Sequence, residues 1–498
     1  MSDLHKDGRD LARGALTVMA GFVPRTLAGL GFLYVAGNLY GAEALGRYYI
    51  VIAAIELMGA VTVFGAKRAL FPLLNAAEAG GKGKAGLADV TLAALLVSLG
   101  LALPSALGLH IWLASLDHDL GRLGPFLAAL IPIIALIDIL LSATRHWRTM
   151  GYDVAARSIA FPWTRVAASG LLGALGFGID GLMAAYGLAL LASAAIALFG
   201  FARLCGISGL RAARPRRALL RAVVRAGAPV MLVELMTTGL RRADILLVGL
   251  IAGPAAAGPY GAAKELATTV EKTHQLFTPV LAPVVAQTLA RRGGAEVGRR
   301  IAQVTRWVLS LQLAQFLFFW QAGAILLGWM GAGFAAAATP LLILLGAEVM
   351  HALAAGAELP VLYTRPWLSP LVMLASLAAM LLASIVLIPP YGALGAALAM
   401  LVAIAVMSLA CLSLARRLVG ANILAPSLLR PLIAAGFVLI LLTLIEGWLA
   451  ALDPAVRLAF AVILALVPYG VLLALMGLAP EDRAAVSALL GKKRAKRR

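Results

Sequence analysis

Apolar runs of about 20 residues follow one another along most of the chain, with short turns between them. A helix of about 20 residues is long enough to cross the hydrocarbon core of a bilayer, which is roughly 30 Å thick. The pattern predicts about fourteen membrane-spanning helices. They lie near residues 14–36, 47–66, 88–112, 124–143, 158–177, 181–202, 227–252, 259–287, 305–328, 335–357, 367–388, 393–415, 431–449 and 457–478. The expected fold class is therefore an all-α polytopic membrane protein.

Two of the predicted breaks depend on only a few turn-forming residues. The turn at 178–181 contains two glycines and an aspartate, and the turn at 389–392 contains two prolines and a glycine. Glycine and proline are the residues that most often interrupt helices, so we count a separate helix on each side of both turns.

Basic residues supply an independent check on this count. Most of the 42 Lys and Arg residues fall in alternate loops and in the tails, as expected for the cytoplasmic side of a membrane protein. The densest clusters are at 211–225 and in the tail KKRAKRR at 492–498. We expect them to determine topology and to lie against anionic lipid headgroups, with docking of a partner protein on the tail as the alternative. The polar opening MSDLHKDGRD does not resemble a secretory leader, which favours a cytoplasmic N-terminus. Fourteen helices with this distribution of basic residues then predict both termini in the cytoplasm.

Composition agrees with this class. Hydrophobic residues are 62% and charged residues 13%, against about 45–50% and 25% in soluble domains. The net charge of +19 would suggest a nucleic-acid partner in a soluble chain. Here the basic residues lie in loops, so no nucleic acid is expected, and the predicted location is the bacterial cytoplasmic (inner) membrane. The two cysteines, Cys205 and Cys411, have no metal-ligand spacing, so no disulfide or metal site is predicted.

Two short motifs occur twice with nearly the same offset. GAEALGRY at 41–48 is echoed by GPAAAGPY at 253–260, 212 residues later, and GIDGLMAAY at 178–186 is echoed by YGALGAALA at 391–399, its glycines offset by 214. Chance is the alternative because glycine is common in this chain, but Tyr48 and Tyr260 also match. A repeat of this length indicates two pseudo-symmetric six-helix lobes with the substrate between them.

The predicted domains follow from the helices and the repeat. They are an N-terminal lobe at 1–210, a basic cytoplasmic linker at 211–226, a C-terminal lobe at 227–420, two extra helices at 421–480 and a basic cytoplasmic tail at 481–498. The predicted outward loops are short, the longest being near 113–123, and the sequence contains no Walker A motif. It also shows no pairing of a nucleophile with a base, so we predict a transporter and not an enzyme, without a cofactor.

Charged residues inside the predicted spans are candidates for the transport site. Arg25 is near the middle of the first helix, and the repeat puts it one turn from the position of Arg241 in the seventh. Each would cost about 2.5–3.5 kcal/mol at a helix centre, so both should face a cavity. Because Arg offers a fixed fork of donors and stays charged, such residues suit an anionic headgroup such as a pyrophosphate. The candidate headgroup residues are Arg25, Arg165, Arg241, Arg242, Lys264 and Lys272.

A second set of residues could line the cleft or couple transport to H⁺ or Na⁺. Glu348 and His351 lie one turn apart and could titrate near neutral pH. Salt bridges or hydrogen bonds that only hold the helices together are the alternative for all of these groups. The candidates are Glu56, Asp138, Glu234, Asp244, Glu271, Glu348 and His351.

Three stretches resemble a known family of transporters. They are LYGAEALGRYYIVIAAIELMGAVTVF from Leu39 to Phe64, ADILLVGLIAGPAAAGPYGAAKEL at 243–266 and LIPPYGALGAALA at 387–399. All three resemble polysaccharide (lipid-linked oligosaccharide, O-antigen type) flippases of the multidrug/oligosaccharidyl-lipid/polysaccharide flippase superfamily, over about residues 10–420. The resemblance implies two six-helix lobes, a cleft lined partly by helices 1, 2, 7 and 8, alternating access and two extra C-terminal helices.

The resemblance also narrows the expected substrate. Polysaccharide flippases move polyprenyl-pyrophosphate-linked oligosaccharide repeat units to the outer leaflet, whereas the multidrug branch exchanges cationic drugs for Na⁺ or H⁺. The basic residues favour a polysaccharide flippase, whose repeat unit would serve synthesis of the O-antigen of lipopolysaccharide, of capsule or of exopolysaccharide. A lipid II-type flippase and a multidrug/cation antiporter are the alternatives. Expected partners are the lipid-linked oligosaccharide and membrane lipids, with a polysaccharide polymerase and glycosyltransferases as candidate protein partners.

Overall fold

The computed structural model describes residues 2–476, apart from residues 82, 117, 148, 207, 208, 210 and 212. The structure is 91% helical, and the described residues contain no strand. Ten helices in this part of the chain are long and apolar enough to cross a membrane. The predicted fold class, an all-α multi-pass membrane protein, is therefore confirmed.

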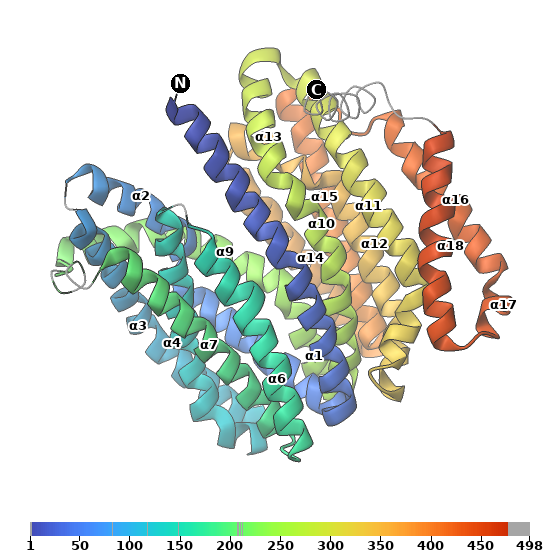
Figure 1. The fold of residues 1–498 in the computed structure, drawn as a ribbon, viewed down its shortest axis with the longest axis horizontal. Helices are drawn as coiled ribbons and strands as arrows, with labels where there is room; N and C mark the ends of the chain where they lie inside the picture. The colour runs from blue at the N-terminus through green and yellow to red at the C-terminus, as the bar shows by residue number, and fades with distance from the viewer. Residues whose placement is uncertain are drawn as a thin grey trace, which may run out of the picture. The chain divides into compact units, whose positions relative to one another are not determined.

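The chain forms two compact units, residues 1–258 and 259–498, and Figure 1 shows their helices coloured along the chain. The predicted domain boundaries stay a prediction. The helices that begin in the first unit are α1 (Ser2–Val63), α2 (Ala66–Ala79), α3 (Gly83–Leu116), α4 (His118–His146), α5 (Gly151–Val154), the π-helical turn η1 (Ala155–Ala160), α6 (Phe161–Ala174), α7 (Ile179–Cys205), α9 (Arg217–Ile251) and the start of α10 (Pro254–Arg292).

The second unit contains most of α10 and all later elements. These are α11 (Gly294–Gly328), the 3₁₀ turn η2 (Ala332–Ala337), α12 (Ala338–Ala355), α13 (Glu358–Thr364), α14 (Leu368–Tyr391), α15 (Ala393–Val419), the 3₁₀ turn η3 (Pro426–Leu428), α16 (Leu429–Leu444), α17 (Glu446–Ala450) and α18 (Pro454–Leu475). The last two long helices pack on α11 through small and aliphatic side chains, including Ala434 and Val438 of α16 and Ala465 of α18.

The breaks expected between helices are present. Helix α1 contains the first two predicted spans and is interrupted at Gly41, whose φ of 81° and ψ of 175° are not helical. A turn at 175–178 separates α6 from α7, slightly before the predicted 178–181, so that Asp180 and Gly181 lie in the first turn of α7. At the second predicted break, Pro389 and Pro390 still lie within α14, and Gly392 at φ 54° separates that helix from α15. A positive φ strains residues with a side chain, so glycine makes this turn.

Two long helices are absent from the ten that meet the apolar criterion, namely α9 and α10. Within its predicted span, each carries four charged residues. These charges lower the hydropathy of both helices, and all of them except Glu265 are candidates for the transport site in the sequence analysis. The polar side chains of α9 and α10 therefore mark these two helices as candidates for a functional site.

Candidate functional site

Two predicted site residues, Glu56 and Arg242, bind each other. Glu56 projects from α1 and Arg242 from α9, which pack against each other within the first unit. The Arg242 Nε lies 2.5 Å from one carboxylate oxygen of Glu56, and Nη2 lies 3.1 Å from the other. This two-point geometry is the strongest arrangement of an arginine with a carboxylate. The structure therefore gives the Arg242 guanidinium a carboxylate partner from its own chain.

Glu234, also on α9, pairs with a residue that the sequence analysis did not consider. Its carboxylate lies 3.2 Å from Nε of Arg68 near the start of α2. The exposed side-chain fraction is 16% for Glu234 and 67% for Arg68, so the carboxylate is the more enclosed partner. This pair neutralises a second acidic residue of the first unit.

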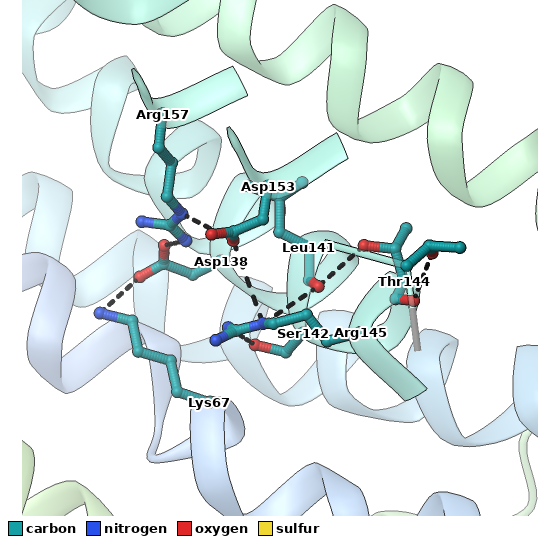
Figure 2. A network of polar contacts seen from close by, with 9 residues as sticks. Lys67, Asp138, Leu141, Ser142, Thr144, Arg145, Asp153 and Arg157 are labelled. Atoms are coloured by element: carbon teal, nitrogen blue, oxygen red, sulfur yellow. Dashed lines mark hydrogen bonds and ion pairs between the residues drawn. The ribbon is translucent and has the colours of Figure 1, made fainter. Parts of the chain in front are cut away.

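Asp138 is the centre of a polar network, which Figure 2 shows from close by. Its side chain on α4 is buried, at 5% exposure. Lys67 of α2 approaches one carboxylate oxygen at 2.8 Å, and Arg157 of η1 donates a hydrogen bond to the other. Because an unpaired buried carboxylate is costly, these two bases are what allow Asp138 to stay charged inside the unit.

The network continues from Arg157 towards the end of α4. Asp153 of α5 lies 3.3 Å from the Arg157 guanidinium and 4.0 Å from that of Arg145. Arg145 also donates to the hydroxyl of Ser142 at 2.9 Å. The sequence analysis missed Lys67, Arg145 and Arg157, which lie just outside or at the edges of the predicted spans. Their position at helix ends was the available signal, because charged side chains there can reach inwards without crossing the bilayer centre.

Arg165 of α6 lies against two aromatic rings. Its guanidinium carbon is 3.9 Å from the ring centroid of Phe32 and 5.7 Å from that of Phe161. A cation over an aromatic face gains about 0.5–2 kcal/mol, more when water is excluded. Aromatic packing thus fixes the position of this charge.

Arg25 on α1 and Arg241 on α9 are both exposed side chains of the first unit. Asp244, three residues after Arg241, is completely buried. Helix α9 thus exposes Arg241 and buries Asp244, which follows it by about one helical turn. The predicted roles of these three residues in a transport site stay predictions.

In the second unit, the predicted residues of α10 are Lys264, Glu271 and Lys272, and all three are partly buried. Helix α10 is bound to α11 beside them by two polar contacts. Thr273 donates to the side-chain oxygen of Gln315 at 2.9 Å, and Gln312 donates to the carbonyl of Val270 at 2.9 Å. These contacts show that Thr273 and Val270 take part in helix packing, while the predicted roles of Lys264, Glu271 and Lys272 stay predictions.

Glu348 and His351 of α12 do lie together, as their spacing predicted. His351 Nδ1 is 3.9 Å from a carboxylate oxygen of Glu348. A third residue joins them: the ring of His274, from α10, meets the ring of His351 edge to face with centroids 4.9 Å apart. The sequence analysis missed His274, although it lies three residues after Glu271 and hence on the same side of α10.

The first part of the chain matches a known family. Residues 11–289 match the model of the family described as "Polysaccharide biosynthesis protein". The chain belongs to this family. The resemblance noted in the sequence analysis is thereby confirmed, since the match covers more than half of the chain.

Solved structures with the same fold are also membrane transporters. The "Lipid II flippase MurJ, inward closed conformation" is 14% identical, with a TM-score of 0.69, over 93% of this chain and 98% of that chain. An inward-facing multidrug resistance MATE family transporter of the MOP superfamily is 14% identical, with a TM-score of 0.65, over 82% and 98%. A MOP superfamily transporter from Pyrococcus furiosus is 15% identical, with a TM-score of 0.52, over 83% and 96%. No curated protein matches the chain.

Family and fold together give a general description of the chain. The low identities establish only the fold, and the family match connects the chain to polysaccharide biosynthesis. The chain is therefore a multi-pass membrane protein of the polysaccharide biosynthesis family, with a fold that it shares with membrane transporters.

Proposed function

We propose that the protein moves a polyprenyl-pyrophosphate-linked oligosaccharide repeat unit from the cytoplasmic to the outer leaflet of the bacterial inner membrane by alternating access. The repeat unit would serve synthesis of O-antigen, capsule or exopolysaccharide. In this proposal both termini lie in the cytoplasm, and a polymerase and glycosyltransferases act with the protein. Membership of the polysaccharide biosynthesis family supports the pathway.

The observation that carries the proposal is the distribution of charge in the first unit. Three acidic residues of its helices are each held by bases: Glu56 by Arg242, Glu234 by Arg68, and Asp138 by Lys67 and Arg157. Arg25 and Arg241 meanwhile are exposed on neighbouring helices. A site that selects cationic drugs would need carboxylates available to the ligand, whereas this arrangement favours an anion.

The chemistry of a pyrophosphate headgroup suits this arrangement. Its oxygens accept hydrogen bonds, and a guanidinium donates them in a fixed plane without losing its charge. Arg25 and Arg241 would replace the water around the headgroup as it leaves the membrane surface. The polyprenyl chain can stay in the bilayer while the headgroup crosses, so the protein needs to shield only the polar part. Coupling to H⁺ or Na⁺ would supply the driving force, and Glu348 and His351 remain candidates for it.

The proposal is tested in cells that lack the endogenous chain and carry variants. We expect Arg25→Ala and Arg241→Ala each to reduce surface polysaccharide by about tenfold or more, since a hydrogen bond to a charged group contributes about 1.5–3 kcal/mol. Lipid-linked repeat units should accumulate on the inner leaflet. Arg122→Ala is the matched control, because it removes an arginine that forms an exposed ion pair with Asp180. Normal export by both test variants at normal protein levels would contradict the proposal.

A lipid II-type flippase is the second candidate, and the fold match to a lipid II flippase favours it. The two functions differ in what accumulates when the chain is depleted. Accumulation of oligosaccharide repeat units and loss of surface polysaccharide support the oligosaccharide flippase. Accumulation of a cell-wall precursor and cell lysis support the lipid II-type flippase. A multidrug antiporter, the third possibility, would instead produce drug sensitivity without either lipid intermediate.

A further inference from the structure

Three side chains in the second unit bring together the donor atoms that transition metals prefer. They are His274 of α10 and the pair Glu348 and His351 of α12. One ligand atom from each of the three lies within 4.8 Å of the other two. All three side chains are partly buried, so the cluster is enclosed without being sealed. The family assignment does not explain why two imidazoles and a carboxylate should meet at this position.

The local geometry follows from the two helices. A Glu and a His three residues apart lie on one face of a helix, so both can reach one ion, as in the Glu-x-x-His pairs of metal-binding helix bundles. His351 Nδ1 lies 3.9 Å from the Glu348 carboxylate, and the His274 ring stands edge to face against His351. Around an ion with bonds of about 2.0–2.1 Å, tetrahedral ligand atoms are about 3.3 Å apart. The ligand atoms would need to approach one another by no more than about 1.5 Å to reach this spacing, which side-chain rotations can supply.

The surroundings of the cluster also favour a cation. Glu271 of α10 and Glu358 of α13 both lie near enough to interact electrostatically with His351. Imidazole nitrogen with one carboxylate is a ligand set typical of Zn²⁺ and neighbouring first-row metals, whereas Mg²⁺ and Ca²⁺ require mostly oxygen ligands. The donor set thus indicates which class of ion would bind.

One position of the coordination sphere would remain open. His274 lines a cavity together with Thr305 of α11 and Ala352 of α12. The cavity reaches the cluster at His274, and a water molecule beside the three side chains would complete the coordination of the ion. Three protein ligands with an open fourth position are common at non-structural zinc sites.

We propose that His274, Glu348 and His351 form a binding site for a divalent transition-metal ion of the Zn²⁺ class. The ion joins α10 to α12, because its ligands come from both helices. A bound ion would therefore oppose any separation of these two helices. This inference does not depend on the proposed function, since it concerns only residues of the second unit and is measured without substrate.

The test is titration of the purified full-length chain, carrying an affinity tag free of histidine, with Zn²⁺ and separately with Co²⁺. We expect one Zn²⁺ per chain by calorimetry and visible absorption from Co²⁺ in a site of low coordination number. His274→Ala and His351→Ala should each weaken Zn²⁺ binding by about 100-fold or more, since loss of even an outer-sphere partner commonly costs 10–100-fold. Thermal unfolding in detergent should shift upwards with Zn²⁺ for the unsubstituted chain only.

Two further variants keep the test decisive. Glu348→Gln preserves the shape of the side chain while removing its charge, so it should fold normally and still lose most of the Zn²⁺ affinity. His110→Ala removes a histidine from α3 in the first unit and should leave the titration unchanged. Zn²⁺ binding that survives all three cluster variants, or the absence of stoichiometric binding to the unsubstituted chain, would overturn the site. The site would also be overturned if the unsubstituted chain binds no metal while substitution of these residues changes the pH dependence of transport. That result would support proton coupling.

Discussion

Gly46 and Gly258 lie against each other's helix backbone, and the contact is reciprocal. A Cβ atom added at Gly46 would lie 1.8 Å from the carbonyl oxygen of Pro254, and one added at Gly258 would lie 2.0 Å from that of Ala42. Gly46 and Gly258 are 212 residues apart, and so are Ala42 and Pro254. The two copies of the repeated motif therefore touch each other, with equivalent atoms in equivalent roles.

The same offset relates the turns that lead into this contact. Gly41 interrupts α1 at φ 81°, and Gly253 precedes α10 at φ 88°. A glycine with positive φ thus stands five residues before the contact glycine in both copies of the motif. This correspondence supports duplication over chance as the origin of the motif, and it agrees with an architecture of two pseudo-symmetric lobes.

The close approach predicts that Gly46→Ala destabilises the protein. No side-chain movement can relieve the clash, because the obstructing atom belongs to the backbone. We expect a loss of at least about 1–3 kcal/mol, the usual cost of overpacking, measured by unfolding in detergent. Gly100→Ala in α3 is the control, since a Cβ there would meet no atom within 4 Å. Equal unfolding temperatures for the two variants would refute the contact.

The polar network in Figure 2 predicts a large effect for Asp138→Asn. The amide would leave the charges of Lys67 and Arg157 without the carboxylate that both now contact. Breaking a buried ion pair costs about 3–5 kcal/mol. Because the side chains of Lys67 and Arg157 are each more than one-third exposed, 38% and 34%, we expect about 2–3 kcal/mol after screening. Asp180→Asn, which removes an acid from an exposed pair with Arg122, should cost less than about 1 kcal/mol. A similar loss in both variants would show that the network does not stabilise the first unit.

The Glu56–Arg242 pair predicts coupling between α1 and α9. Glu56→Gln and Arg242→Gln should each lower the unfolding temperature, and the double variant should lose less than the sum of the two. The non-additivity of residues in direct contact is about 0.5–3 kcal/mol, which a double-mutant cycle measures. Strict additivity would mean that the two-point contact contributes nothing to stability.

The fold could be predicted from the sequence because its determinants are local. The length of each apolar run and a turn residue such as Gly392 are sufficient to place helices, whichever helices they pack against. Even so, Pro389 and Pro390 did not end α14 as expected, since a helix in a membrane protein can tolerate prolines near its end.

The pairing of the charged residues could not be predicted, because it depends on tertiary contacts. Glu56 and Arg242 were both identified, but they are separated by 186 residues, and no periodicity along one helix relates them. Glu234 lies on one helix face with Arg241, and yet its ion-pair partner, Arg68, comes from α2. The position of His274 on the same side of α10 as Glu271 could be predicted, but its contact with His351 could not, because that contact depends on how α10 packs against α12.

The most direct test of the central claim is the affinity of the purified protein, in lipid nanodiscs, for a polyprenyl-pyrophosphate-linked oligosaccharide. The double variant Arg25→Ala/Arg241→Ala should bind it about 100-fold more weakly, at about tenfold for each lost charged contact. Arg122→Ala should bind it normally, and a cationic drug should not compete. If the double variant binds the lipid as tightly as the unsubstituted protein, these arginines do not recognise the pyrophosphate, and the proposed function loses its structural basis.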